Sequence, residues 1–411
     1  MLHLWNELQP RALSSAQLSR KIKDNPAYGL FIAFLISIFF LKGGFANTVA
    51  AICFATSWIL IAREARGSEF PTPLIAPIVL VFLIASGLRL LLPPYGTAGA
   101  VPGSGVSHVL LVAGLYGLIL FVQSRLCFSQ ILRLIAVAAF ACVILTLIAA
   151  PKFGDRLLLI GRTENPILAA GAIVAGVIAA ITLLAYHADI RRAPLTVVLL
   201  AFMVCGTLTG VYLAGSRGPL LALVFALCVT PLIVSNGSRT LLFVCAFGAY
   251  ALVTASVLLA APIRHLLCPT IELACRDPSR FDVWMQSLDT IAQHPLWGVG
   301  YAFRFEGIPH AHNTYLGMAL HYGIPLALFF VCVMAVALSQ ASKLKNKDEK
   351  FFIVAMLIFA NGFMASDLSE PLRFFNTHYG FLWLPVFLAM MRPEIAQRAS
   401  IRKDEHFSAT T

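Results

Sequence analysis

Residues 166–186 read PILAAGAIVAGVIAAITLLAY, a mostly apolar run without a single charged side chain. About 20 such residues in a helix cross the hydrocarbon core of a bilayer. The rest of the 411-residue chain has the same character, because 59% of it is hydrophobic, 12% is charged and its mean hydropathy is +0.84. An ordinary soluble domain carries about a quarter charged residues. This composition excludes a soluble enzyme with one membrane anchor, a disordered protein and a disulfide scaffold, and it predicts a polytopic membrane protein.

Twelve stretches have the length and apolar character of a membrane-spanning helix. They lie near 27–41, 45–62, 74–92, 106–123, 131–150, 166–186, 194–213, 219–235, 240–261, 314–340, 351–366 and 378–391. Lys42-Gly43-Gly44 separates the first two. Lipid-exposed strands would show alternating polarity, which is absent, so the spans are expected to be helices. The sequence therefore predicts an all-α polytopic fold of about twelve transmembrane helices, in which residues 1–411 form a single integral membrane domain.

The distribution of basic residues predicts the orientation. An even number of spans places both ends on one side, and no small-residue cleavage site of a signal peptide follows the first span. With the tails 1–26 and 392–411 in the cytoplasm, nineteen of the 30 Lys and Arg residues lie on the cytoplasmic side. The net charge of +11 then divides into +9 inside and +2 outside, as the positive-inside rule requires. We therefore expect this charge to meet membrane lipids, with no nucleic-acid partner.

One connection, residues 262–313 between the ninth and tenth spans, is long enough for an extramembrane fold. It contains Cys268 and Cys275. In an oxidising compartment these two form either a disulfide or a pair of free thiols, and we expect the disulfide. The chain has no CxxC pair and no His/Cys cluster with zinc spacing, so we expect no metal site.

This outer loop also contains the pattern of an amphipathic helix. Its apolar residues recur at helical spacing: Phe281, Trp284, Met285, Leu288 and Ile291. Asp277 or Ser279 could cap the helix, and His294-Pro295 ends it. We expect the helix to lie on the membrane surface or to cover a cavity. Arg280 falls in the first turn, where the helix dipole disfavours a cation. It is therefore either a solvated charge or an arginine aimed at an anion.

A second polar group follows at the mouth of the tenth span. Gly298-Val299-Gly300 gives a loop whose backbone can approach a ligand, although it lacks the third glycine of a dinucleotide site. His310 and His312 are candidates for proton transfer near neutral pH, and the alternative is a structural histidine. Asn313 could orient an imidazole or donate to an oxygen. We expect His321, deeper in the span, to pack or to hydrogen-bond.

Arg217 lies between the seventh and eighth spans. Gly218-Pro219 suits the start of a helix, so Arg217 is placed at a helix N-terminus, which favours anions. A guanidinium can hold two phosphate oxygens at once. These features predict a phosphate site. The alternative is a positive charge that reaches the membrane interface.

These motifs together resemble a known family. Ser216-Arg217-Gly218 after the seventh span is similar to the signature of the bacterial O-antigen ligase and polymerase superfamily. So is the series Arg280…Trp284…His294-Pro295-Leu296-Trp297-Gly298-Val299-Gly300…His312-Asn313, and so is the layout of twelve spans with one large periplasmic loop. As in the ligases, nine residues separate His312-Asn313 from Gly323. Leu326 departs from the pattern, because the ligases commonly carry a small residue or Tyr there.

The resemblance implies an O-antigen ligase in the bacterial inner membrane. Such an enzyme moves a polysaccharide from undecaprenyl diphosphate to a sugar hydroxyl of the lipid A–core at the periplasmic face, without metal or cofactor and with inversion. An O-antigen polymerase and a protein O-oligosaccharyltransferase are the alternatives within the superfamily. A lipid or solute transporter is the alternative from another class, but the chain shows no convincing internal repeat, and its spans hold almost no ionisable residues.

The resemblance also implies roles for particular residues. The departing diphosphate gains negative charge, so Arg217 and Arg280 are expected to stabilise it. His312 is expected to be the general base toward the acceptor hydroxyl. The remaining candidates are expected to bind the diphosphate or the acceptor: Arg89, Tyr95, Asn313, His310 and Ser216.

Overall fold

The computed structural model describes the greater part of the chain. The described residues are 25–65, 76–91, 105–149, 152–153, 156–158, 160–161, 166–215, 217–236, 280–301, 303, 305, 311–366, 368, 370–372 and 375–391. The helices of the first half are α3 (Pro26–Phe39), α4 (Gly43–Ala65), α5 (Ala76–Leu91), α6 (Val106–Gln123), α7 (Phe128–Ala149), α8 (Pro166–Tyr186), α9 (Ala188–Arg192) and α10 (Pro194–Leu213). Those of the second half are α11 (Arg217–Asn236), α14 (Arg280–Gln293), α15 (Thr314–Tyr322), α16 (Ile324–Ser342) and α17 (Lys347–Ser366).

The final helix, Tyr379–Met391, opens with a π-helical turn, η2 (Tyr379–Trp383). A short antiparallel pair, β1 (Lys152–Phe153) and β2 (Arg156–Leu157), follows α7.

Helices occupy eleven of the twelve positions at which the sequence predicts spans; the ninth, 240–261, lies outside the described residues. Within the described part, seven helices are long and apolar enough to cross a membrane. α17 is not among these seven, since it begins with four charged residues, yet every residue from 351 to 360 is buried. The all-α polytopic architecture is thus confirmed in its coarse form, and the count of twelve stays a prediction.

The break between the first two spans is confirmed. α3 ends at Phe39, and α4 begins at Gly43, whose φ of 52° lies in the left-handed region that favours glycine. The two helices then pack against each other.

The prediction of one continuous tenth span over 314–340 is wrong. The structure divides it into α15 and α16 at Gly323, whose φ is 91°. Pro325 lies in the first turn of α16, where a missing N–H costs nothing. Hydrophobicity runs unbroken across this point, so the apolar pattern alone predicted a single helix.

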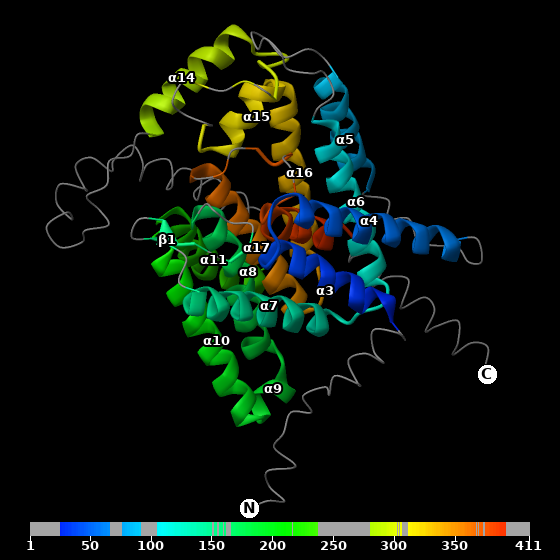
Figure 1. Cartoon of the computed structure of the whole chain (residues 1–411), viewed down its shortest axis with the longest axis vertical. Coiled ribbons are helices and arrows are strands. Elements are labelled where there is room, and N and C mark those ends of the chain that lie inside the picture. Colours follow the sequence, from blue (N-terminus) through cyan, green and yellow to red (C-terminus); the bar gives the residue numbers. More distant parts are fainter. Residues whose placement is uncertain are drawn as a thin grey trace, which may run out of the picture.

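α17 forms the centre of the bundle. α11 packs along it, and a Cβ placed on Gly362 would lie 3.1 Å from the Cβ of Ala222, so small residues let the two helices approach closely. α8 packs against α7, α10 and α17. Figure 1 shows α14 and α15 at one end of the molecule and α9 at the other.

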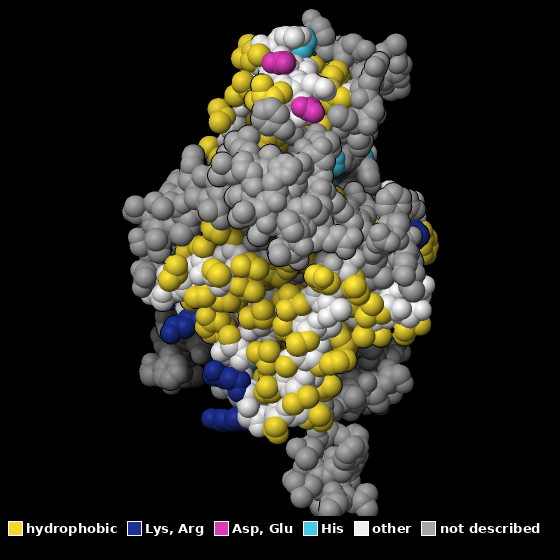
Figure 2. All heavy atoms as spheres, turned by 90° about the vertical axis from the view of Figure 1, so that its left-hand side faces the viewer, with side chains coloured by type: hydrophobic (Ala, Val, Ile, Leu, Met, Phe, Trp, Pro, Cys, Tyr) yellow, Lys and Arg dark blue, Asp and Glu magenta, His cyan; other side chains and the backbone are white. Residues whose placement is uncertain are grey.

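The outward face of the bundle is apolar. α10 exposes Leu195, Val198, Leu199 and Phe202, and α11 exposes Leu221 and Val224. Figure 2 shows hydrophobic side chains over a broad face, with acidic side chains toward the α14 end and Lys and Arg toward the opposite end. A soluble protein does not expose so large an apolar surface, so this face is suited to lipid.

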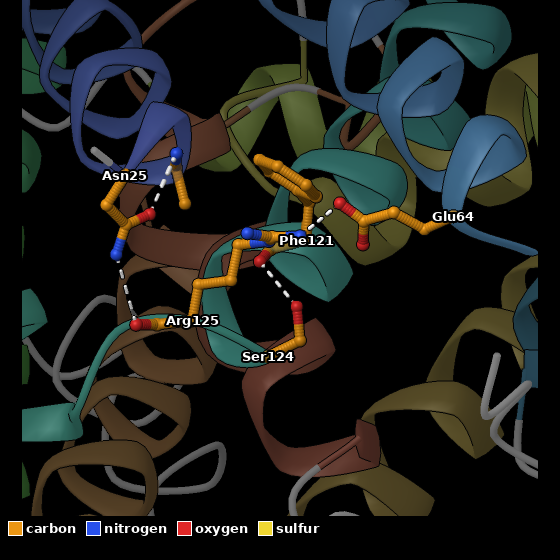
Figure 3. Close-up of polar contacts among 6 residues, drawn as sticks. Asn25, Glu64, Phe121, Ser124 and Arg125 are labelled. Carbon is orange, nitrogen blue, oxygen red and sulfur yellow. Dashed lines mark hydrogen bonds and ion pairs between the residues drawn. The ribbon is translucent and has the colours of Figure 1, made fainter. Parts of the chain in front are cut away.

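A polar cluster joins the start of α3 to the ends of α4 and α6 (Figure 3). Arg125 forms an ion pair with Glu64, and its guanidinium lies 4.7 Å from the ring centre of Phe121. Asn25 caps α3 and donates to the Arg125 carbonyl at 3.3 Å. The orientation predicted from charge assigns all three helix ends to the same side of the membrane, and here they lie together.

Candidate active site

The amphipathic helix predicted in the outer loop is present as α14. Its inner face is buried and comprises Val283, Trp284, Ser287 and Ile291, whereas Asp282 and Asp289 are exposed. The indole Nε1 of Trp284 donates to the backbone oxygen of Ala311 at 2.9 Å. α14 therefore covers the segment that leads directly to His312.

His312 has a φ of 50° and is the non-glycine residue with positive φ in the described part of the chain. This left-handed conformation is uncommon for a residue with a Cβ, and the structure around it must hold it in place. Ala311 on one side is fixed by Trp284, and Asn313 on the other side is buried. The imidazole itself is half-buried, at the start of α15.

Asn313 fixes the other side of His312. Its Oδ1 accepts from the backbone N–H groups of Tyr315 and Leu316 at 3.0 and 3.1 Å, which makes it the N-cap of α15. Its Nδ2 donates to the Ala365 carbonyl, near the end of α17, at 3.0 Å. These contacts give Asn313 a positioning task beside His312, and its role toward substrate stays a prediction.

The two predicted catalytic arginines each begin a helix. Arg217 is the first residue of α11, and Arg280 is the first residue of α14. The position of Arg217 confirms that this segment opens a helix, although the side chains of both arginines lie outside the described part. α17 packs along α11 and also holds Asn313, so it connects the helix of Arg217 to the helix that follows His312.

Other predicted residues also lie outside the described part. They are Ser216, Tyr95, His310, Cys268 and Cys275.

The glycine loop after α14 packs against the break between α15 and α16. Val299 N–H donates to the Leu320 oxygen at 2.7 Å, Gly300 N–H to the His321 oxygen at 3.1 Å, and Ile324 N–H to the Pro295 oxygen at 2.8 Å. A Cβ on Gly298 would overlap the Leu320 oxygen, and one on Gly323 would overlap the Leu296 oxygen. The backbone of this loop therefore does make a close approach, as predicted. It approaches the backbone at the end of α15, whereas we expected it to approach a ligand.

Arg89 secures the same loop from α5. Its Nε donates to the Trp297 oxygen, and its Nη2 donates to the Gly298 oxygen at 3.2 Å. The residue is 5% exposed. Its described contacts are thus with loop carbonyls, and binding of the diphosphate or acceptor by Arg89 stays a prediction.

A buried pair of side chains, His321 and Glu370, lies beside the glycine loop. Glu370 was not identified from the sequence. His321 Nδ1 lies 2.9 Å from the Gly300 oxygen, and its Nε2 lies 3.0 Å from Glu370 Oε1. The side chains are 3% and 0% exposed. Because a carbonyl only accepts, Nδ1 is the donor to the Gly300 oxygen, and Nε2 faces the carboxyl group of Glu370. The hydrogen-bonding role predicted for His321 is confirmed. Glu370 could have been noticed as one of two carboxylates, with Asp367, between two apolar spans.

Within the described residues, no three His, Cys, Asp or Glu side chains lie close enough together to hold a metal ion. The candidate site therefore offers a histidine, His312, whose neighbours are held by fixed contacts. The helices α11 and α14, which begin at Arg217 and Arg280, belong to the same bundle.

Comparison with known proteins identifies this arrangement. Residues 202–331 match the family described as O-antigen ligase. An O-antigen ligase of Pseudomonas aeruginosa strain PAO1 is 28% identical over 352 residues, which cover 81% of this chain and 82% of that protein. Both matches support the assignment of this chain to the O-antigen ligase superfamily. The resemblance seen in Ser216-Arg217-Gly218 and in His312-Asn313 is therefore confirmed.

The matched part of the superfamily pattern contains the helices that carry the candidate site, from α10 to the middle of α16. Arg217, Arg280 and His312 all fall within it. Arg89 and Glu370, which hold the glycine loop and α15 from outside, lie beyond it on either side. The structure thus adds to the matched segment a set of supporting contacts from α5 and from the residues after α17.

Proposed function

We propose that this member of the O-antigen ligase superfamily transfers a polysaccharide from undecaprenyl diphosphate to a sugar hydroxyl of the lipid A–core. The observation that carries the proposal is the conformation of His312. Its backbone is in the left-handed region, between a residue fixed by Trp284 and a buried helix cap. A conformation that costs free energy and is held from both sides is typical of functional residues.

His312 acts as the general base in the proposed reaction. It removes the proton of the acceptor hydroxyl while that oxygen bonds to the anomeric carbon of the donor sugar. The bond between the anomeric carbon and the diphosphate oxygen breaks, and its electron pair leaves with undecaprenyl diphosphate. Attack from the face opposite the leaving group inverts the anomeric centre.

Arg217 and Arg280 stabilise the departing diphosphate. Each is the first residue of a helix, where unpaired N–H groups and the helix dipole already favour an anion. The guanidinium groups add full positive charge that is in place before the reaction begins. No step of this mechanism uses a metal ion, and we expect activity to survive exhaustive chelation.

We place the reaction at the periplasmic face of the inner membrane, with both termini in the cytoplasm. Two features support this. The site lies at the α14 end of the molecule, whereas α9 with the exposed Arg191 and Arg192 lies at the opposite end (Figure 1). Basic residues mark cytoplasmic ends.

Complementation of a strain that lacks its ligase tests the proposal. Wild-type protein should restore core-attached O-antigen on lipopolysaccharide gels, and His312→Ala should lower ligation at least about 100-fold, the usual contribution of a general base. His187→Ala, at the start of α9 and at the opposite end of the molecule, is the matched control for loss of an imidazole and should keep most activity. Normal ligation by His312→Ala would remove this residue from the mechanism.

The role of Arg217 is tested in the same assay. Arg217→Ala should abolish ligation, and Arg217→Lys should restore only part of it, because an ammonium lacks the planar fork that holds two phosphate oxygens. Arg191→Ala, at the opposite end, should have no effect. In a strain deleted for this protein, core that carries a single repeat unit would instead indicate a polymerase. Donor transport without glycan transfer in proteoliposomes would indicate a transporter.

A further inference from the structure

The turn after α14 exposes two large apolar side chains. Leu296 and Trp297 are each 64% exposed, although they belong to the loop predicted to lie outside the membrane. The turn is rigidly held. Arg89 donates to the Trp297 and Gly298 oxygens, and Ile324 N–H donates to the Pro295 oxygen. Its exposure is therefore a fixed feature of the fold.

The helices that hold the turn both present apolar stripes to the outside. α5 exposes Leu80, Ile84, Leu88 and Leu91, which recur every three or four residues and so form one face. α16 exposes Ile324, Leu328 and Val331 with the same spacing. These are faces that a membrane helix presents to lipid chains.

The turn continues both stripes. Leu88 precedes Arg89, whose side chain donates a hydrogen bond to the turn. Ile324 donates its backbone N–H to the Pro295 oxygen at the base of the turn. Leu296 and Trp297 thus stand where the two lipid-facing stripes end. Tryptophan is enriched at this level of a bilayer, because its large ring is apolar and its indole N–H is polar.

We propose that the Leu296–Trp297 turn is inserted into the outer-leaflet interface and that phospholipid covers it. The loop between α14 and α15 is then anchored in the membrane by its own side chains. This proposal does not depend on the reaction that the protein catalyses.

Tryptophan fluorescence in vesicles tests the insertion. Trp5→Phe/Trp58→Phe serves as the background, since Trp58 on α4 is also exposed, whereas Trp284 and Trp383 are buried. The protein is reconstituted into phosphatidylcholine that is brominated either near the top or near the end of the acyl chain. We expect the shallow bromines to quench a component of the emission more strongly than the deep ones, and Trp297→Phe to remove that component.

A matched control moves the indole to the polar side of the same loop. Gln286 is exposed on α14 next to Asp282 and Asp289. Gln286→Trp combined with Trp297→Phe should be quenched by aqueous iodide and little by bromolipid, the reverse of Trp297. Iodide quenching of Trp297, or protection from both quenchers, overturns the proposal; the second result would mean that protein covers the turn. Both substitutions are at exposed positions, so the variants should fold.

Discussion

At the scale of single residues, the structure assigns His321 and Glu370 to one buried unit. The pair joins α15 to the glycine loop and to the segment after α17. Two buried polar side chains that face each other are tolerated in an apolar interior as long as both are present. Removal of one member leaves the other without its partner.

This unit gives a stability prediction. His321→Ala should lower the free energy of unfolding in detergent by about 3 kcal/mol, because the Glu370 carboxyl loses the imidazole that faces it. Glu370→Gln should cost less than about 1 kcal/mol, since an amide N–H can still donate to Nε2. Tyr322→Phe, which keeps the ring and removes a long hydrogen bond of 3.4 Å to the Leu372 oxygen, is the control for loss of an ordinary buried hydrogen bond. Equal losses for His321→Ala and Tyr322→Phe would contradict the special role of the pair.

At the scale of elements, the informative feature is the break between α15 and α16. Gly323 and Pro325 were visible in the sequence, but the apolar run from 314 to 340 predicted one helix. The decisive contact is the approach of the Leu296 carbonyl to Gly323, which comes from a different segment. A contact between distant segments has no signature in local hydrophobicity. The apolar span could therefore be predicted from the sequence, but its break into α15 and α16 could not.

Gly323→Ala tests the break. The new Cβ would overlap the Leu296 oxygen, and the φ of 91° is strained for any residue with a side chain. We expect the substitution to lower the free energy of unfolding by about 1–3 kcal/mol and to reduce ligation, because the glycine loop must move away.

Gly87→Ala on α5 is the matched control. A Cβ at that position meets nothing within 4 Å, so the change should be neutral or should stabilise the helix by up to about 1 kcal/mol. Full ligation by Gly323→Ala would mean that the close backbone contact is not needed.

At the scale of the whole molecule, orientation can be tested with a native thiol. Cys127 is exposed in the turn between α6 and α7, beside the cluster of Asn25, Glu64 and Arg125. In a variant with Cys268→Ser and Cys275→Ser, a membrane-impermeant maleimide should label Cys127 only after the inner membrane is opened. Ala292→Cys, at an exposed position of α14, should be labelled in intact spheroplasts. The opposite pattern would reverse the proposed topology.

The span positions could be predicted from sequence because length and apolarity are local properties. The supporting contacts of the site could not. Asn313 bonds a carbonyl 52 positions away, and Arg89 bonds one 209 positions away. Their side chains were noticed for their chemistry, but only the fold shows that this chemistry is directed at the protein's own backbone. His312 and the helix starts at Arg217 and Arg280 were predictable because motif and local helix signals coincided there.

The manner in which α15 is held has a consequence for the biogenesis of the protein. His312 precedes α15, yet the carbonyl of Ala365 and the carboxyl of Glu370 that fix this helix come from much later in the chain. A nascent chain that has released α16 into the membrane already contains the three candidate catalytic residues, but it lacks the contacts from Ala365 and Glu370 that hold α15. The enzyme is therefore assembled only when α17 and the segment after it have entered the bundle, and a chain truncated after α16 should insert into the membrane and remain inactive.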